Sequence, residues 1–159
     1  MKKLITATML AAFGMTMAAA ATEANLYSLT VHRGSSIGSI ELLRLQDGRP
    51  FTVRAVTGGF DWSLIAGAHV TAAATHRIDI RVRAQKNSPG SVGLHLFDWR
   101  LNRWVHVAPL NFGLTQMTTS TVTISTNASR WVVPGGSIRV RFVALNGTMF
   151  TDQVRITVN

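Results

Sequence analysis

Residues 77–83 read Arg-Ile-Asp-Ile-Arg-Val-Arg, and this alternation of charged and aliphatic side chains decides the fold. Successive side chains of an extended strand point to opposite faces, so the three aliphatic residues lie on one face and the charged residues on the other. The same period of two recurs at 138–142 and at 154–158. The pattern predicts half-buried strands of an antiparallel sheet.

The rest of the chain carries the same kind of signal. Runs rich in Val, Ile, Thr and Phe end in Gly, Pro, Asn or Asp clusters at intervals of about ten residues, which is typical of an antiparallel sandwich or barrel. No long stretch has a helical period, although residues 37–45 are compatible with one or two helical turns. Strands are predicted at 27–32, 51–56, 62–65, 76–84, 92–98, 103–107, 118–126, 138–145 and 153–158.

The apolar faces of these strands define a predicted core. An all-β, antiparallel fold of 138 residues is long enough to bury one sizeable core, so we expect a single domain over residues 22–159. The core is predicted to include Ile78, Ile80, Val82, Leu94, Leu96, Val105, Val140, Phe142, Val154 and Ile156.

Residues 1–21 have the pattern of a cleaved secretory signal peptide. Lys2 and Lys3 precede an apolar run over residues 4–17, and small residues follow at 18–21. The run is shorter than the ~20 residues of a spanning helix, which disfavours the alternative of an uncleaved anchor. We therefore expect a protein that is secreted, periplasmic or on the cell surface, with no transmembrane segment after cleavage.

The expected mature chain is basic. Two of the 16 basic residues lie in the leader, which leaves 14 against 7 acidic residues, a formal charge of +7. Such a charge attracts polyanions such as acidic polysaccharide, lipopolysaccharide or nucleic acid, of which nucleic acid is not an expected partner of an exported protein. With no cysteine in the chain, disulfides, thiolate metal sites and a cysteine nucleophile are excluded.

Arginines alternate with the aliphatic residues of three predicted strands. If the strands at 76–84, 138–145 and 153–158 share a sheet, their outer side is an arginine-rich face. Arg81, Arg139 and Arg141 are then candidate anion-binding residues, and the alternative is a plain solvated surface. The arginine-rich face would comprise Arg77, Arg81, Arg83, Arg139, Arg141 and Arg155.

Residues 94–107 predict a hairpin with a four-residue loop, Trp99 to Asn102. The predicted pairs are Leu94 with Val107, His95 with His106, Leu96 with Val105, Phe97 with Trp104 and Asp98 with Arg103. The aliphatic pairs form a core face. The histidines, Phe97 and Trp104 form the other face, with Trp99 at the tip.

This aromatic row resembles a sugar-binding platform, because C–H faces of sugar rings stack on indole while hydroxyls require directional polar partners. The alternative is a cross-strand aromatic pair that only stabilises the sheet. The hairpin combines flat apolar rings with a few polar side chains, which is the mixture that small-molecule sites show. The candidate ligand-binding residues are Phe97, Trp99, Arg100, Asn102, Arg103 and Trp104.

Metal and enzyme chemistry are harder to assemble from this sequence. His95 and His106 could supply two imidazole ligands to a metal ion, but the sequence indicates no third ligand, so no metal or cofactor is expected. Paired carboxylates, a Gly-x-Ser-x-Gly elbow, a His-Glu-x-x-His motif and a phosphate loop do not occur. The single candidate acid–base cluster is His95, Asp98 and His106, and we expect no catalytic residues.

Three segments carry a resemblance. The Phe-Asp-Trp and Trp of 97–104, the run Asn-Ala-Ser-Arg-Trp-Val-Val-Pro-Gly-Gly-Ser-Ile-Arg-Val-Arg at 127–141, and Asp-Gln-Val-Arg-Ile at 152–156 resemble secreted bacterial β-sandwich modules. Those modules are similar to the galactose-binding-like jelly rolls of bacterial carbohydrate-binding modules. The resemblance implies a jelly-roll sandwich. This chain has Asp98 where Asn is common in the modules, and it lacks a recognisable calcium loop.

Three function classes follow. The first is a non-catalytic exported module that binds carbohydrate or another anionic surface polymer. The second is a purely structural or protein-interaction domain of an envelope or extracellular assembly, and the third is a small hydrolase. Exposure of Phe97, Trp99 and Trp104 separates the first two, whereas a pocket with convergent His and Asp would indicate the third. The sequence leaves the ligand and the oligomeric state open.

Overall fold

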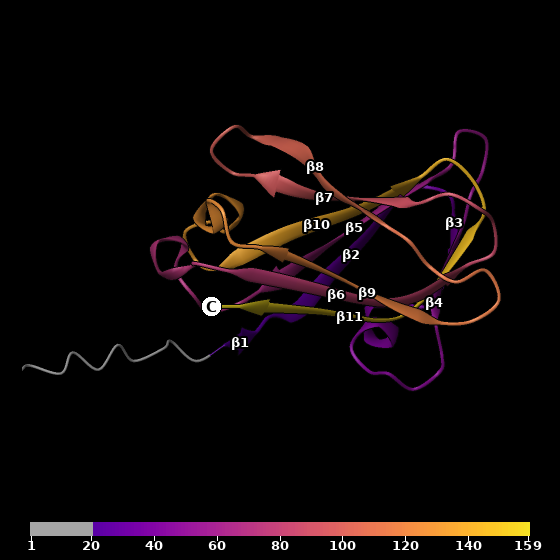
Figure 1. Cartoon of the computed structure of the whole chain (residues 1–159), viewed down its shortest axis with the longest axis horizontal. Helices are drawn as coiled ribbons and strands as arrows, with labels where there is room; N and C mark the ends of the chain where they lie inside the picture. The colour runs from indigo at the N-terminus through magenta and orange to yellow at the C-terminus, as the bar shows by residue number, and fades with distance from the viewer. Residues whose placement is uncertain (1–20) are drawn as a thin grey trace, which may run out of the picture.

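The computed structural model describes residues 21–159, which form two antiparallel sheets packed face to face (Figure 1). The strands are β1 Thr22–Glu23, β2 Asn25–Arg33, β3 Ser35–Ile37, β4 Phe51–Arg54, β5 Phe60–Gly67, β6 Ile78–Lys86, β7 Val92–Asp98, β8 Arg103–Leu110, β9 Thr118–Ile124, β10 Ser137–Ala144 and β11 Thr148–Val158. Three short 3-10 helices are η1 Ile40–Leu43, η2 Ala72–Ala74 and η3 Ala128–Trp131. The predicted all-β sandwich is confirmed.

The two sheets differ in strand order. The six-stranded sheet runs β3-β4-β11-β6-β9, and β1 pairs with the end of β11. The five-stranded sheet runs β2-β5-β10-β7-β8. Among residues 21–159 no helix is long and apolar enough to cross a bilayer. The signal peptide predicted over 1–21 lies, apart from Ala21, outside the described residues and stays a prediction.

Each of the nine predicted strands corresponds to a strand of the structure, and β7 has the predicted bounds. The sequence analysis missed β1 and β3, which are two and three residues long. The helical turns predicted over 37–45 are the single turn of η1, flanked by the end of β3.

The core fills the space between the sheets. Trp62 of β5 lies fully buried near its centre, stacked on Phe142 with ring centroids 4.3 Å apart and edge-on to Phe51 at 5.3 Å. Of the ten predicted core residues nine are buried, and Val105 is half-buried against the core. The alternation at 77–83 therefore does divide core from surface as predicted.

The arginine-rich face is not a single surface, which corrects the sequence analysis. β6 and β11 lie together in the six-stranded sheet, whereas β10 lies in the five-stranded sheet. Arg81 is therefore on the opposite side of the sandwich from Arg139 and Arg141. Alternation fixes which residues face outward but does not specify which sheet a strand joins.

A buried lysine ties two loops at one end of the sandwich. Lys86 is 1% exposed, and its Nζ lies within hydrogen-bond distance of four oxygens: the Ser88 carbonyl at 2.9 Å, the Ser88 Oγ at 2.7 Å, the Pro89 carbonyl at 3.0 Å and the Asn146 Oδ1 at 2.8 Å. It thereby joins the β6–β7 connection to residues 145–147, which carry the chain from β10 in one sheet to β11 in the other. Burial lowers the pKa of Lys86.

Candidate functional site

The β7–β8 hairpin has the predicted four-residue turn, 99–102, and four of its five predicted pairs. His95 pairs with His106, Leu96 with Val105, Phe97 with Trp104 and Asp98 with Arg103. The fifth is wrong, because the register shifts between Leu94 and His95 and Leu94 pairs with Ala108 instead of Val107. The shift leaves the aromatic pair and the histidine pair on the outer face.

Asp98 holds this turn in place from the core side. Its Oδ1 accepts from the backbone N–H groups of Arg100 at 2.9 Å and Leu101 at 3.1 Å, and its Oδ2 pairs with the Arg130 guanidinium of η3. Although burial opposes ionisation, Arg130 and the two amides together hold the pKa of Asp98 below its usual range. The backbone N–H of Trp99 donates to the Arg130 carbonyl at 3.2 Å, which connects the hairpin to η3.

The candidate acid–base cluster is not assembled. Asp98 is fully buried on the inner side of β7, while His95 and His106 lie on the outer side with ring centroids 5.1 Å apart. Positions 95 and 98 are an odd number of residues apart, which places them on opposite faces of a strand. Within residues 21–159, no group of three or more His, Asp or Glu side chains is placed to hold a metal ion.

Phe97 is the centre of an aromatic cluster on the outer side of the five-stranded sheet. Its ring is edge-on to Trp99 at 4.9 Å and to Trp104 at 5.4 Å. All three side chains are half-buried. Trp99 folds back onto Phe97 and does not extend from the tip as expected, and its Nε1 is buried without a hydrogen-bond partner among residues 21–159.

Two arginines of β10 complete this aromatic cluster. The Arg139 guanidinium carbon lies 4.7 Å from the Trp99 ring centroid and 5.3 Å from that of Phe97. The Arg141 guanidinium carbon lies 5.5 Å from the Trp104 centroid. Arg141 also pairs with Asp61 of β5, with 2.7 Å between Nε and Oδ1, and this hydrogen bonding raises the pKa of Arg141. Such contacts fix cations against the faces of the rings.

A hollow of about 300 Å³ adjoins the cluster on the same face. Its walls include Trp104 of β8 and His32 of β2, which come from the two edges of the sheet. His32 Nε2 is hydrogen-bonded to Ser63 Oγ at 2.8 Å. We call it the face hollow. Its lining residues are Thr30, His32, Ser63, Leu64, Ile65, Trp104 and Arg139.

One transverse row of paired residues crosses the sheet from edge to edge: Thr30, Ser63, Arg141, His95 and His106. Thr30 and Ser63 of this row line the face hollow. Burial lowers the pKa of His95, and His106 and Arg141 lower it further, against the opposing effects of the Gly93 carbonyl and Asp61. His95 is therefore an uncharged hydrogen-bonding group near neutral pH.

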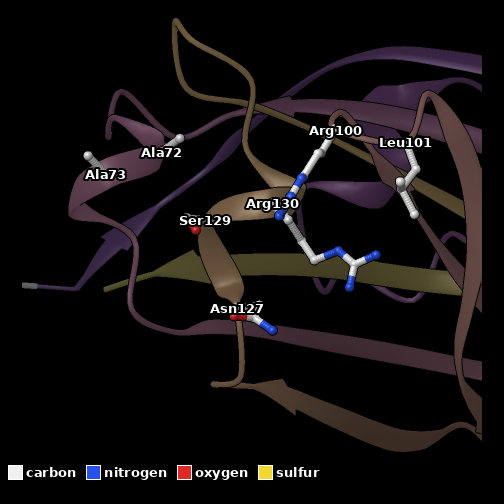
Figure 2. Close-up of a pocket in the computed structure, with 7 residues that line it drawn as sticks. All are labelled: Ala72, Ala73, Arg100, Leu101, Asn127, Ser129 and Arg130. Carbon is white, nitrogen blue, oxygen red and sulfur yellow. The ribbon is translucent and has the colours of Figure 1, made fainter.

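A second hollow, of about 560 Å³, lies at the end of the sandwich where the hairpin turn meets η2 and η3 (Figure 2). Arg100 and Leu101 line one side, and Ala72 and Ala73 of η2 line the other. The predicted ligand-binding residues therefore separate. Phe97, Trp99 and Trp104 lie on the outer face, Arg100 lines the end hollow, and Asn102 and Arg103 are exposed at the turn.

The sequence analysis missed the polar part of the face hollow. Thr30, His32 and Ser63 come from β2 and β5, which are far from the hairpin in the sequence and join it only through β10. No motif marks them, and the one available signal is their outward position in strands with an alternating pattern.

Comparison with solved structures identifies the architecture. A family 29 carbohydrate-binding module, the K74A variant of CBM29-2 complexed with cellulohexaose, matches with a TM-score of 0.56 and 8% identity, over 86% of this chain and 91% of that one. The fold is that of a carbohydrate-binding-module jelly roll. The CBM22-1 xylan-binding domain of Paenibacillus barcinonensis Xyn10C matches with a TM-score of 0.54 and 11% identity, over 87% and 92% of the two chains. A CBM4 structure matches with a TM-score of 0.50 and 13% identity, over 82% and 78%.

At the level of sequence, no protein-family model and no curated protein matches this chain. The identities to the solved structures are low, so the likeness describes the fold, and function has to be argued from the site itself.

Proposed function

We propose that this protein is a non-catalytic, exported module that binds carbohydrate on the outer face of its five-stranded sheet. The observation that carries the proposal is that the aromatic cluster of Phe97, Trp99 and Trp104 lies next to the face hollow. Trp104 contributes to both, and it is half-buried with no partner sheet packed over it among the described residues. An aromatic wall beside hydroxyl and imidazole groups matches the two surfaces of a sugar ring.

The polar groups of this face suit sugar hydroxyls. Thr30 and Ser63 supply hydroxyls that both donate and accept, and His32 and His95 supply ring nitrogens. The neighbouring folds include a module complexed with cellulohexaose and a xylan-binding domain, which supports glycan as the ligand class. The separation of Asp98 from the two histidines supports a binding role over hydrolysis.

The leader-like pattern of residues 1–21 supports export to the periplasm, the cell surface or the medium. A purely structural or protein-interaction domain is the competing function. It requires that the outer face have no affinity for glycans, and this makes the proposal testable.

The test is a glycan array followed by affinity electrophoresis with the polysaccharides that respond. Trp104→Ala should abolish retardation while urea unfolding still shows a cooperatively folded protein, with a loss of stability similar to that of Phe150→Ala, because Trp104 is half-buried against Phe97. Phe150→Ala is the matched control, since Phe150 is a half-buried aromatic on the outer side of the six-stranded sheet. Absence of binding to every glycan would return the protein to the structural class, and full binding by Trp104→Ala would exclude the outer face as the binding surface.

A further inference from the structure

Almost all acidic side chains of this protein form an ion pair with an arginine. Six of the seven form an ion pair, each with a different arginine, and the seventh, Glu41, accepts from Ser39. The pairs are Asp47 with Arg49, Asp79 with Arg77, Asp152 with Arg83, Asp98 with Arg130, Asp61 with Arg141 and Glu23 with Arg155.

Arg139 differs from these arginines. Among residues 21–159 it has no carboxylate partner. Its Nε, like that of Arg83, is buried without a hydrogen-bond acceptor. Asp61 is an acid of the same outer face, and both of its oxygens contact Arg141. A buried N–H without an acceptor is rare in folded proteins and is commonly satisfied by a ligand or water. The charge of Arg139 is thus uncompensated, and it lies at the wall of the face hollow.

The guanidinium of Arg139 is also held in position before any ligand arrives. It lies over Trp99 at 4.7 Å and Phe97 at 5.3 Å, and the turn that carries Trp99 is fixed by Asp98. A planar guanidinium restrained against aromatic rings loses little freedom when it binds a planar anion. Its fork of N–H groups matches the two oxygens of a carboxylate.

Building on the proposed function, we propose that the face hollow is a subsite for a uronic acid residue of an acidic polysaccharide. Arg139 binds the sugar carboxylate, the indole of Trp104 contacts the ring, and Ser63 and His32 bind hydroxyls. The hollow of about 300 Å³ is at the lower end of the range of about 300–1,000 Å³ seen for small-molecule sites, which suits one sugar unit of a chain.

Two features favour a carboxylated sugar over a neutral one or a free ion. A neutral sugar would leave the charge of Arg139 uncompensated next to a ligand that displaces water from it. A free ion would leave the apolar wall of Ile65 and Trp104 unused. A sulfated sugar has the same charge, and the experiment separates it from a carboxylated one.

The experiment is calorimetric titration of the purified protein with oligosaccharides of three polyuronates: polygalacturonate, alginate and polyglucuronate. The matched ligand is carboxyl-reduced polygalacturonate, which keeps the sugar backbone and loses the charge. At least one polyuronate should bind, and Arg139→Gln should weaken it about tenfold or more, because hydrogen bonds to a charged group are lost. Arg139→Lys should restore only part of the affinity, since it retains the charge without the fork.

Arg54→Gln is the control for charge alone. Arg54 is exposed on β4 of the six-stranded sheet and has no ion pair among residues 21–159, so its loss should leave polyuronate binding unchanged. Urea unfolding of each variant reports its folding. Equal binding of acidic and carboxyl-reduced ligand, or an Arg139→Gln variant that binds as the parent does, overturns the uronate subsite.

The remaining outcomes are also decisive. Dextran sulfate that binds as tightly as the polyuronates overturns the uronate subsite. Equal losses in Arg139→Gln and Arg54→Gln then mean general electrostatic attraction, and a loss in Arg139→Gln alone means a sulfate-binding subsite. Binding of neutral xylan or glucan oligosaccharides alone, lost in Trp104→Ala, overturns the subsite and leaves the proposed function standing. If no acidic, neutral or sulfated glycan binds, the proposed function itself fails.

Discussion

Replacing Asp98 should loosen the hairpin turn and lower the free energy of unfolding in two separable steps. Asp98→Asn keeps an oxygen for the Arg100 and Leu101 amides but loses the charge-assisted bonds to Arg130. Such bonds contribute about 1.5–3 kcal/mol, and we expect the lower part of that range because Arg130 is 33% exposed and partly screened. Asp98→Ala also loses two backbone hydrogen bonds of about 0.5–1.5 kcal/mol each, so it should cost about 2.5–5 kcal/mol.

Urea unfolding followed by tryptophan fluorescence measures both steps, and Asp47→Asn is the control. Asp47 pairs with Arg49 two residues away in an exposed loop, so its loss should barely move the unfolding midpoint. If Asp98→Asn were as stable as the parent, or Asp98→Ala no less stable than Asp98→Asn, the carboxylate would not be what holds the turn.

The same carboxylate predicts a pH dependence. The pKa of Asp98 is lowered in the folded protein from its ordinary value of 3.8, so its contribution is fully present above that value and is lost as the pH falls below it. The unfolding free energy of the parent should therefore fall more steeply than that of Asp98→Asn below about pH 4. Parallel curves for the two proteins in that window would contradict the lowered pKa.

Three further predictions concern the core, the loops and the face. Leu96→Ala should cost about 2–5 kcal/mol in urea unfolding because Leu96 is fully buried, and a neutral Leu96→Ala together with an unfolded Phe97→Ala would reverse the assigned faces of β7. Lys86→Met should cost at least about 2 kcal/mol in the same assay, since four oxygens lose a buried cationic donor, and an unchanged midpoint would refute that role. Polyuronate affinity, measured by calorimetry, should rise as the pH falls from about 7.5 to 5. His95 pairs with Arg141 on the same outer face as Arg139, so a carboxylate bound at Arg139 raises the lowered pKa of His95 and binding then takes up a proton. In His95→Gln that rise should be smaller, and an identical pH profile would exclude His95 as the linked group.

Much of the architecture could be predicted from the sequence, because the information is local. The alternation at 77–83 separates core from surface within one strand, and the polar and aromatic partners across residues 97–104 fix a register through matched pairs. The short β1 and β3 carry too few residues to show a period. The shift at Leu94 has no sequence signal, since Ala108 and Val107 are both small and apolar.

The site was less predictable, because its contacts connect distant segments. Trp99 folds back because Phe97 and Arg139 form a surface for it, and Arg139 comes from a strand that the sequence placed beside Arg81. Asp98 seemed a candidate acid until Arg130, 32 residues later, proved to be its partner. Strand order between sheets is a property of the whole chain, and local periodicity does not carry it.

The buried Lys86 supplies a positive charge to the loops at its end of the sandwich that does not depend on ions in solution. A cation recruited from solution stabilises a fold only in proportion to its free concentration relative to its dissociation constant. The ammonium of Lys86 is covalently part of the chain, so its local concentration at Ser88, Pro89 and Asn146 does not change with dilution or with chelators in the medium. At this end of the sandwich the connecting loops are thus held together by a cation that the chain itself supplies.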